Sequence, residues 1–228
     1  MTRFTCWEAE MTKFSNWLEE RSGWNAVWET IFLRKIPKVN WFYTLGSATL
    51  FVALNQGITG ILMSLYYVPS PDHAWNSVNY ITNELAFGWL IRGLHHWGAS
   101  AMVVLAVLHM LRVFLMGAYK YPREITWVTG LFLLLLTLGF GFTGYLLPWD
   151  QKAYWATTVG TRIAGVTPFI GDFLLRVMRG GEELSAVTLA RFFGVHVWVL
   201  PALLILFVGV HLYLVIRNGI SAPPKRSE

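Results

Sequence analysis

The chain has 228 residues, of which 55% are apolar and only 14% are charged. Soluble domains carry roughly a quarter charged residues, so this composition excludes an ordinary water-soluble protein and favours a membrane protein. The formal charge of +5 does not indicate nucleic-acid binding, because the basic residues form no dense run, and the single cysteine, Cys6, excludes an internal disulfide.

The first predicted element is an amphipathic helix within residues 1–40. Apolar side chains recur there at helical spacing, with Glu and Lys between them, so we expect the helix to lie in the membrane interface. A docking helix for a partner subunit is an equally good interpretation. The apolar positions are Phe4, Trp7, Met11, Phe14, Trp17 and Leu18.

Four apolar segments follow, each long enough to cross about 30 Å of hydrocarbon, which takes roughly 20 helical residues. They cover residues 41–67, 89–116, 125–147 and 193–216. Because lipid leaves no backbone group unpaired, each is expected to be an α-helix. The predicted fold class is therefore an all-α membrane protein, with a four-transmembrane-helix bundle over residues 41–217 and a C-terminal tail over residues 218–228.

The distribution of Lys and Arg predicts the orientation of the bundle. Basic residues occur in the first 40 residues, in the connection over residues 117–123 and in the tail, whereas residues 68–88 contain none. Basic connections stay on the cytoplasm-like side, so both termini are predicted on the negative side. Residues 148–192 carry five basic residues, which weakens this signal. We expect this connection to form one or two short helices on the positive surface.

Two of the predicted spans carry histidines in pairs. His95 and His109 are 14 residues apart, which places them within about 40° of each other and about 21 Å apart along a helix. His196 and His211 are 15 residues apart, about 60° and about 22 Å. His96 lies about 140° from His109 and points elsewhere.

The two histidine-bearing helices run in the same direction, so their histidines form cross-helix pairs at matching depths. His95 pairs with His196 near the positive side, and His109 pairs with His211 near the negative side. Each pair can supply two axial nitrogens to one haem iron. For a single histidine we would prefer a hydrogen-bonded core residue, but ionisable residues inside a membrane mark function by default.

Glycines on the other two spans repeat the same period. Gly46 and Gly60 are 14 residues apart, as are Gly130 and Gly144. Glycine lets a helix backbone approach a flat porphyrin closely, so these positions are expected to pack against two stacked haems b. Close helix packing by small residues is the alternative interpretation.

Three arginines lie near the histidines in sequence. Arg92 precedes His95 by three residues, Arg112 follows His109 by three, and Arg191 precedes the next histidine by five. Guanidinium groups suit carboxylates, so we expect these arginines to bind haem propionates. Ordinary snorkelling at helix ends is the alternative.

Several longer motifs accompany these spacings, namely RGLHHWGAS, LHMLRVF, PREITWVTG, GFTGYLLPWDQKAYWATTV, LARFFGVHVWVLP and the tail IRNGIS. Together they resemble the cytochrome b family of Rieske/cytochrome b complexes over nearly the whole chain. The resemblance is closest to the short, split, four-helix form of chloroplast-type bf complexes and bacterial menaquinol:cytochrome c reductases.

The resemblance implies a function as well as a fold. The chain would be the di-haem cytochrome b subunit of a quinol:cytochrome c oxidoreductase, inactive alone, in a bacterial inner membrane or an organellar energy-transducing membrane. Electrons would pass from a positive-side quinol oxidation site through two bis-histidine haems b to a negative-side quinone reduction site, coupled to proton translocation. The positive-side haem, on His95 and His196, would have the lower potential, and the haem on His109 and His211 the higher.

By the same resemblance, two sets of residues would line the quinone sites. Part of the quinol oxidation pocket would be formed by Tyr145, Trp149, Asp150, Trp155, Ala156 and Thr157. The quinone reduction pocket would lie near Arg217, Asn218, Gly219 and Ser221.

The resemblance also implies partners, because this chain lacks the P-E-W-Y loop that completes the oxidation pocket in the family. A separate three-helix subunit would supply the loop, alongside a Rieske iron–sulfur protein and a c-type cytochrome, in a homodimeric complex surrounded by lipid. The split form commonly reads F-Y-C where this chain has Phe42, Tyr43 and Thr44. Threonine forms no thioether, so a covalent third haem c is not expected.

Two other functions compete with this interpretation. A non-catalytic haem anchor of a dehydrogenase would need no positive-side quinol pocket, so the LLPWDQ motif argues against it. A proton or metal transporter built on membrane histidines would need no haem, and it would leave the glycine pairs unexplained.

Overall fold

The computed structural model describes residues 6–23, 25, 28–29 and 41–221, and every regular element in that part of the chain is helical. This agrees with the predicted all-α fold. In chain order the elements are α1 (Cys6–Ser22), the 3-10 turn η1 (Trp41–Thr44), α3 (Leu45–Ser64), α4 (Ala74–Asn83), α5 (Gly88–Leu115), α6 (Glu124–Leu146), α7 (Gln151–Gly165), α8 (Gly171–Arg179), α9 (Ala186–Gly194), the π-helical turn η2 (Val195–Val199) and α10 (Leu200–Asn218).

Four helical stretches of the described chain are long and apolar enough to cross a membrane, as the sequence predicts. They are Trp41–Ser64, Gly88–Leu115, Glu124–Leu146 and Ala186–Asn218. The last one begins earlier than expected, because α9, η2 and α10 follow one another without a break. Only 6 to 11% of the residues in their most apolar windows are buried within the chain. Most of this apolar surface is therefore left for lipid, a cofactor or another chain.

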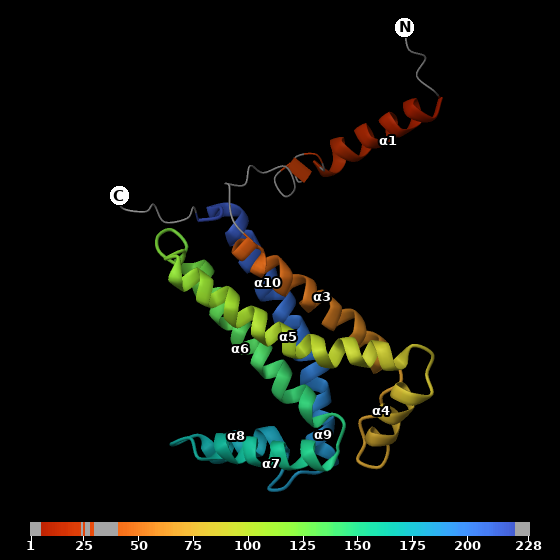
Figure 1. Cartoon of the computed structure of the whole chain (residues 1–228), viewed down its shortest axis with the longest axis vertical. Coiled ribbons are helices and arrows are strands. Elements are labelled where there is room, and N and C mark those ends of the chain that lie inside the picture. Colours follow the sequence, from red (N-terminus) through yellow and green to blue (C-terminus); the bar gives the residue numbers. More distant parts are fainter. Residues whose placement is uncertain (1–5, 24, 26–27, 30–40, 222–228) are drawn as a thin grey trace.

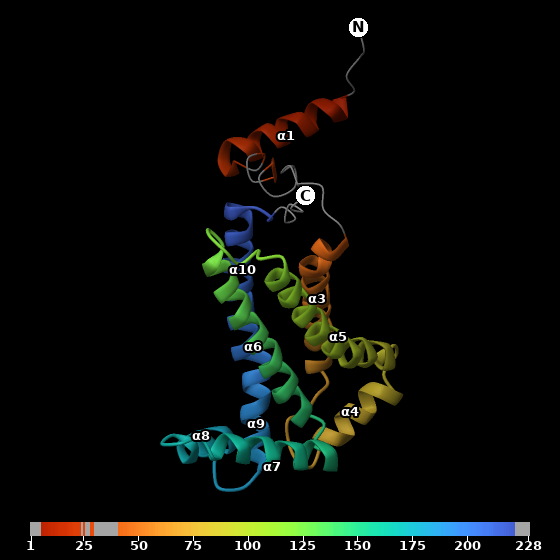
Figure 2. The same ribbon diagram turned by 60° about the vertical axis from the view of Figure 1, so that its left-hand side comes forward.

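The spanning helices are arranged as two pairs, with α3 packed along α5 and α6 packed along α10 (Figure 1). The helices α5 and α6 also touch, and this contact joins the pairs. Helices α4, α7 and α8 gather at one end of the bundle, which we call the surface-helix end (Figure 2). The α5–α6 connection and the C-terminus of α10 lie at the opposite end, which we call the tail end.

A small buried core closes the surface-helix end. Ala74, Leu146, Leu189 and Phe192 pack together there, so α4, the end of α6 and α9 meet in one cluster. The hydroxyl of Tyr67 donates a hydrogen bond of 2.6 Å to the carbonyl of Leu147, and this bond ties the chain after α3 to the end of α6.

Helix α4 lies in a connection for which the sequence analysis predicts no element. Ala74, Ser77 and Ile81 are its buried residues, and their spacing of three and four places them on one face. The remaining positions include polar residues, and the helix is short. The hydropathy pattern that identifies a membrane span therefore does not detect it.

The connection between α6 and α9 forms the predicted surface helices, α7 and α8, and Arg179 joins them. This residue is only 5% exposed. Its Nε donates to Thr161 Oγ1 (2.8 Å), its Nη1 to the Glu182 carbonyl (2.7 Å) and its Nη2 to the Thr158 carbonyl (3.1 Å). The hydroxyl of Thr188 on α9 in turn donates to the Arg179 carbonyl at 2.6 Å. The buried guanidinium of Arg179 thus fixes α7 against the end of α8, and the backbone carbonyl of the same residue holds the start of α9.

Candidate haem-binding site

The structure brings the predicted histidine pairs together. The ring centres of His95 on α5 and His196 on η2 lie 6.4 Å apart, with an angle of 69° between the ring planes. A metal–imidazole bond is about 2 Å long and the bonding nitrogen lies about 1 Å from the ring centre, so a shared metal would hold two ring centres about 6 Å apart. The observed spacing fits this requirement. His109 and His211 also lie close enough to interact, on α5 and α10 toward the tail end.

His96 takes no part in either pair, as its helical phase predicts. Its side chain is exposed and its ring packs edge-on against Trp97, with 5.4 Å between the ring centres. His95 and His96 are consecutive, so their side chains lie about 100° apart around α5, and only His95 points toward the other histidine-bearing helix.

The π-helical turn η2 contains His196 and explains the unequal histidine spacings. A π turn takes one more residue than an α turn, and such turns often occur at functional sites. One of the 15 residues from His196 to His211 is therefore absorbed by the turn. The remaining spacing equals the 14 residues from His95 to His109, so the two helices present their histidines alike.

Each of the four predicted glycines lies against one histidine ring. The glycines of α3 face the histidines of α5, and those of α6 face the histidines of η2 and α10. A Cβ atom added at the glycine would lie 2.7 Å from Cε1 of the facing ring for Gly144 and His196, 3.0 Å for Gly46 and His109, 3.2 Å for Gly60 and His95, and 3.4 Å for Gly130 and His211. An imidazole ring therefore sits deep between the helices at each of these four positions.

These distances rank the glycines by their sensitivity to alanine. Gly144→Ala is expected to push the His196 ring out of place, since overpacking typically costs about 1–3 kcal/mol. Gly130→Ala should have a much smaller effect, because its added methyl meets His211 at an ordinary contact distance of 3.4 Å. Haem content and the midpoint of thermal unfolding of the two purified variants test this order. A larger loss in Gly130→Ala than in Gly144→Ala would show that contacts with the histidine rings do not determine which glycines tolerate alanine.

Three threonines that the sequence analysis does not predict support the histidines. Each is buried and directly precedes one of the glycines, and each hydroxyl oxygen lies within hydrogen-bond distance of a histidine Nδ1. The distances are 3.0 Å for Thr59 and His95, 3.0 Å for Thr129 and His211, and 2.9 Å for Thr143 and His196.

The hydrogen-bond partners of these threonines define the direction of each bond. Every hydroxyl donates to a carbonyl of its own helix: Thr59 to Asn55 (2.6 Å), Thr129 to Thr126 (2.9 Å) and Thr143 to Gly139 (2.8 Å). A hydroxyl has one hydrogen, so toward the histidine it must accept, and Nδ1 carries the proton. The other ring nitrogen, Nε2, then keeps its lone pair, which is the form that binds a metal.

Polar groups without a partner mark the tail end of the site. Among the described residues, Arg112 Nε and Nη2, Tyr43 Oη and Thr126 Oγ1 are buried and make no hydrogen bond. The Arg112 guanidinium lies 3.4 Å from the centre of the Tyr43 ring. Because buried polar groups are nearly always satisfied, this cluster fits an anionic group such as the carboxylates of a haem.

The other two predicted arginines lie toward the surface-helix end. Arg92 is half-buried in the first turns of α5. Arg191 on α9 is exposed, and its Nη1 donates to the carbonyls of Arg176 (3.4 Å) and Val177 (2.7 Å) near the end of α8. Arg191 therefore caps α8, a role that its sequence position does not indicate.

The residues predicted for quinol oxidation lie where α6 leads into α7. Asp150 is the N-cap of α7 and accepts a hydrogen bond of 2.7 Å from the Ala153 backbone. Trp149 before it has a φ of 53°, a conformation that non-glycine residues rarely adopt. Thr157 is 1% exposed and packs inside the surface-helix layer. The exposed members of the set are Tyr145, Trp155 and Ala156.

The residues predicted for quinone reduction follow one another at the tail end. Arg217 and Asn218 end α10, and Gly219 has a φ of 71°, which favours glycine at a helix C-terminus. Arg123, which the sequence analysis does not include, donates to the carbonyls of Gly219 (3.1 Å) and Asn218 (3.4 Å). The α5–α6 connection thereby holds the end of α10, with Ser221 just beyond.

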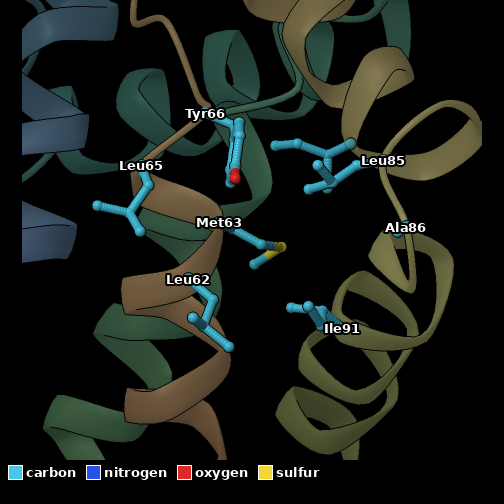
Figure 3. Close-up of a pocket in the computed structure, with 8 residues that line it drawn as sticks. Leu62, Met63, Leu65, Tyr66, Leu85, Ala86 and Ile91 are labelled. Atoms are coloured by element: carbon cyan, nitrogen blue, oxygen red, sulfur yellow. The ribbon is translucent and has the colours of Figure 1, made fainter.

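An apolar groove of about 170 Å³ lies between the end of α3, α4 and the start of α5 (Figure 3). Met63 and Tyr66 point into it from one side, and Leu85 and Ile91 face them from the other. None of the predicted site residues lines this groove.

Comparison with known proteins places this arrangement in a family. The sequence model of the family described as Cytochrome b/b6/petB matches residues 31–219. Cytochrome b6 of Synechococcus elongatus is 46% identical, over 93% of this chain and 100% of that protein. The menaquinol:cytochrome c reductase cytochrome b subunit of Geobacillus thermodenitrificans is 44% identical, over 93% of this chain and 99% of that protein.

A solved structure supports the same relationship. A chain of a hyperthermophilic respiratory Complex III superposes with a TM-score of 0.83 at 34% sequence identity. The match covers 93% of this chain and 58% of the length of the other, so this chain corresponds to little more than half of that relative. The chain therefore belongs to the cytochrome b/b6 family.

Proposed function

We propose that this chain is the di-haem cytochrome b subunit of a quinol:cytochrome c oxidoreductase complex. The observation that carries the proposal is the pair His95 and His196, whose ring centres lie 6.4 Å apart with Nδ1 of each ring directed to a threonine. These two residues would hold one haem at the surface-helix end. His109 and His211 would hold the second toward the tail end.

The haems supply one-electron redox chemistry when bound, and the polypeptide supplies ligands, orientation and a low dielectric. The two ligands on α5 are 14 residues apart, or about 21 Å, so the sites span most of the membrane. Donation from Nδ1 of His95, His196 and His211 to the threonines keeps Nε2 of these three rings available as a ligand. Arg112 would neutralise a propionate at the tail end, where the Tyr43 hydroxyl could donate a hydrogen bond to it, and Arg92 and Arg191 are our candidates for the other end.

We further propose that the surface-helix end faces the positive side of the membrane and that both termini face the negative side. The placement of Lys and Arg in the short connections supports this orientation. Residues 1–40, which include α1, would lie in the negative-side interface, residues 41–217 would form the di-haem unit, and residues 218–228 would form the tail.

The quinone sites would lie at the two ends of the bundle. The exposed face of Tyr145, Trp155 and Ala156, with Trp149, Asp150 and Thr157 behind it, would form one wall of the quinol oxidation pocket. The segment from Arg217 to Ser221 would border the quinone reduction pocket. Quinol oxidation releases protons at the positive side and quinone reduction takes them up at the negative side, so the electron path is coupled to proton translocation.

This chain would act only within a complex. The Geobacillus relative is by name one subunit of a reductase, and the solved relative is part of a respiratory complex. We propose that a three-helix subunit with the P-E-W-Y loop completes the oxidation pocket. A Rieske iron–sulfur protein and a c-type cytochrome would accept electrons, and the complex would form a homodimer in lipid.

The haem stoichiometry of the purified complex tests the proposal. We expect two non-covalent haems b for each copy of this chain, measured by acid–acetone extraction and pyridine haemochrome spectra. One haem per chain, or none, would reject the di-haem assignment.

A covalently bound haem is not expected on this chain, because Thr44 stands where a thioether would require cysteine. The Thr44 side chain is exposed and its hydroxyl donates to the Trp41 carbonyl at 2.6 Å. Haem staining of a denaturing gel should therefore show no band at 26.0 kDa. A stained band of that mass would contradict the prediction.

A further inference from the structure

We propose that Thr59, Thr129 and Thr143 are positioning residues that set the reduction potentials of the two haems unequally. They support three of the four histidine ligands and leave His109 unsupported. The inference rests on the proposed di-haem function and adds a structural origin for the direction of electron flow.

The first step of the argument is the effect of one hydrogen bond on a ligand. Each threonine oxygen accepts a hydrogen bond from the Nδ1–H of one histidine, and this raises the basicity of the ligating nitrogen. A more basic ligand favours ferric over ferrous iron, which lowers the potential, since second-shell hydrogen bonds are one of the main determinants of haem potential. Reduction adds one electron to the iron and no proton to the ligand, because the Nδ1 proton stays on the ring.

The second step is the uneven distribution of these bonds. At the surface-helix end both ligands are supported, His95 by Thr59 (3.0 Å) and His196 by Thr143 (2.9 Å). At the tail end His211 is supported by Thr129 at 3.0 Å. No hydrogen bond to the His109 ring is found among the described residues.

His109 lacks such a hydrogen bond because the residue before its facing glycine is a leucine. Gly60 of α3 faces His95, and Thr59 directly precedes it. Gly46 of the same helix faces His109 in the same way, but Leu45 precedes it and offers no oxygen. A haem bound at the surface-helix end would therefore be held at the lower potential, and electrons would run downhill toward the tail end.

The charge of Arg112 favours the ferrous form at the tail-end pair, and Arg92 and Arg191 would act in the same way toward the surface-helix end. The contribution of the threonines must therefore be measured by changing the threonines alone. Valine has nearly the shape of threonine without the hydroxyl, so it removes the bond and preserves the packing.

The experiment is a redox titration of the haem α-bands of the purified complex. Thr143→Val should raise the potential of the lower-potential haem alone, and Thr129→Val that of the higher-potential haem alone. We expect each shift to approach a tenfold change in the reduction equilibrium, which is about 59 mV for one electron. Thr143→Ser keeps the hydroxyl and should restore the wild-type potential.

Thr137 provides the matched control. It is also buried on α6, but its hydroxyl donates to the Leu133 carbonyl, at 2.9 Å, and no hydrogen bond joins it to a histidine among the described residues. Thr137→Val should therefore leave both potentials unchanged. A shift in this variant as large as in Thr143→Val would mean that the potentials respond to packing, which would overturn the proposal.

Leu45→Thr tests the inference in the opposite direction. It places a hydroxyl before Gly46, at the position equivalent to Thr59, and should lower the potential of the tail-end haem. If the valine variants lose haem, the proposal is tested by Leu45→Thr alone. An unchanged potential of the tail-end haem in Leu45→Thr would then overturn the proposal. Valine variants that retain two haems at wild-type potentials would overturn it as well, while leaving the di-haem function intact. A wild-type complex without two haems would instead reject the proposed function.

Discussion

Replacing His95 with alanine is expected to remove the lower-potential haem and to leave the other haem in place. Alanine takes away one of the two nitrogens at the surface-helix end, and His196 alone cannot complete the pair. His109 lies 14 residues further along α5, or about 21 Å, so the tail-end pair should be unaffected. The haem content should fall by half, and a redox titration should show only the higher-potential component.

His96 provides the control for this experiment, since it is the neighbouring residue on the same helix. Its ring is exposed and packs against Trp97, so His96→Ala should retain both haems. Loss of haem in this variant would refute the assignment of ligands by helical phase. Loss of only the higher-potential component in His95→Ala would reverse the assignment of the two ends.

Replacing Arg179 with alanine should strongly reduce quinol oxidation while both haems remain bound. The guanidinium makes three hydrogen bonds in a nearly closed environment, to Thr161, Glu182 and Thr158. Each buried partner left unsatisfied costs about 1–3 kcal/mol, so α7 should lose its fixed position against α8. Because α7 carries the proposed wall of the oxidation pocket, the reductase activity of the complex should fall, and limited proteolysis should cut within residues 151–185 more readily.

Arg176 offers a matched control one turn earlier on α8. Its side chain is exposed and pairs with Asp172 at 3.0 Å, and surface ion pairs contribute about 0–1 kcal/mol. Arg176→Ala should therefore keep wild-type activity and protease resistance. Equal losses in the two variants would show that the buried contacts of Arg179 are not what holds the surface helices.

The four spans are predictable from the sequence because the membrane imposes one requirement on all of them. About 20 apolar residues must follow one another, and the hydropathy pattern gives their ends to within a few residues except at α9. The expected start at residue 193 leaves most of α9 in the surface connection, whereas in the structure α9, η2 and α10 follow one another without a break, although Pro201 lies in the first turn of α10. The histidine pairs were predictable because the two helices run in the same direction. Each helix carries one histidine near its start and one near its end, so only histidines at the same depth can pair.

The threonines, the π turn and α4 were not predictable in the same way. A hydroxyl in a membrane helix usually bonds to a carbonyl of its own helix, so nothing in a single threonine indicates a second partner. The repeated dipeptide Thr-Gly, at Thr59, Thr129 and Thr143, is the signal that could have identified the set. The π turn leaves no mark in composition, and only the extra residue between His196 and His211 points to it.

The arrangement of the spanning helices as two pairs has a consequence for how this protein is made. Each haem would take one ligand from α5, in the first pair, and one from η2 or α10, in the second. Membrane helices have little hydrophobic drive to associate, whereas a cofactor that binds only the closed form stabilises it by mass action. Newly inserted chains would then persist as two hairpins until haem cross-links them, exposed in the meantime to membrane proteases. The supply of haem would thereby set how much of this subunit accumulates.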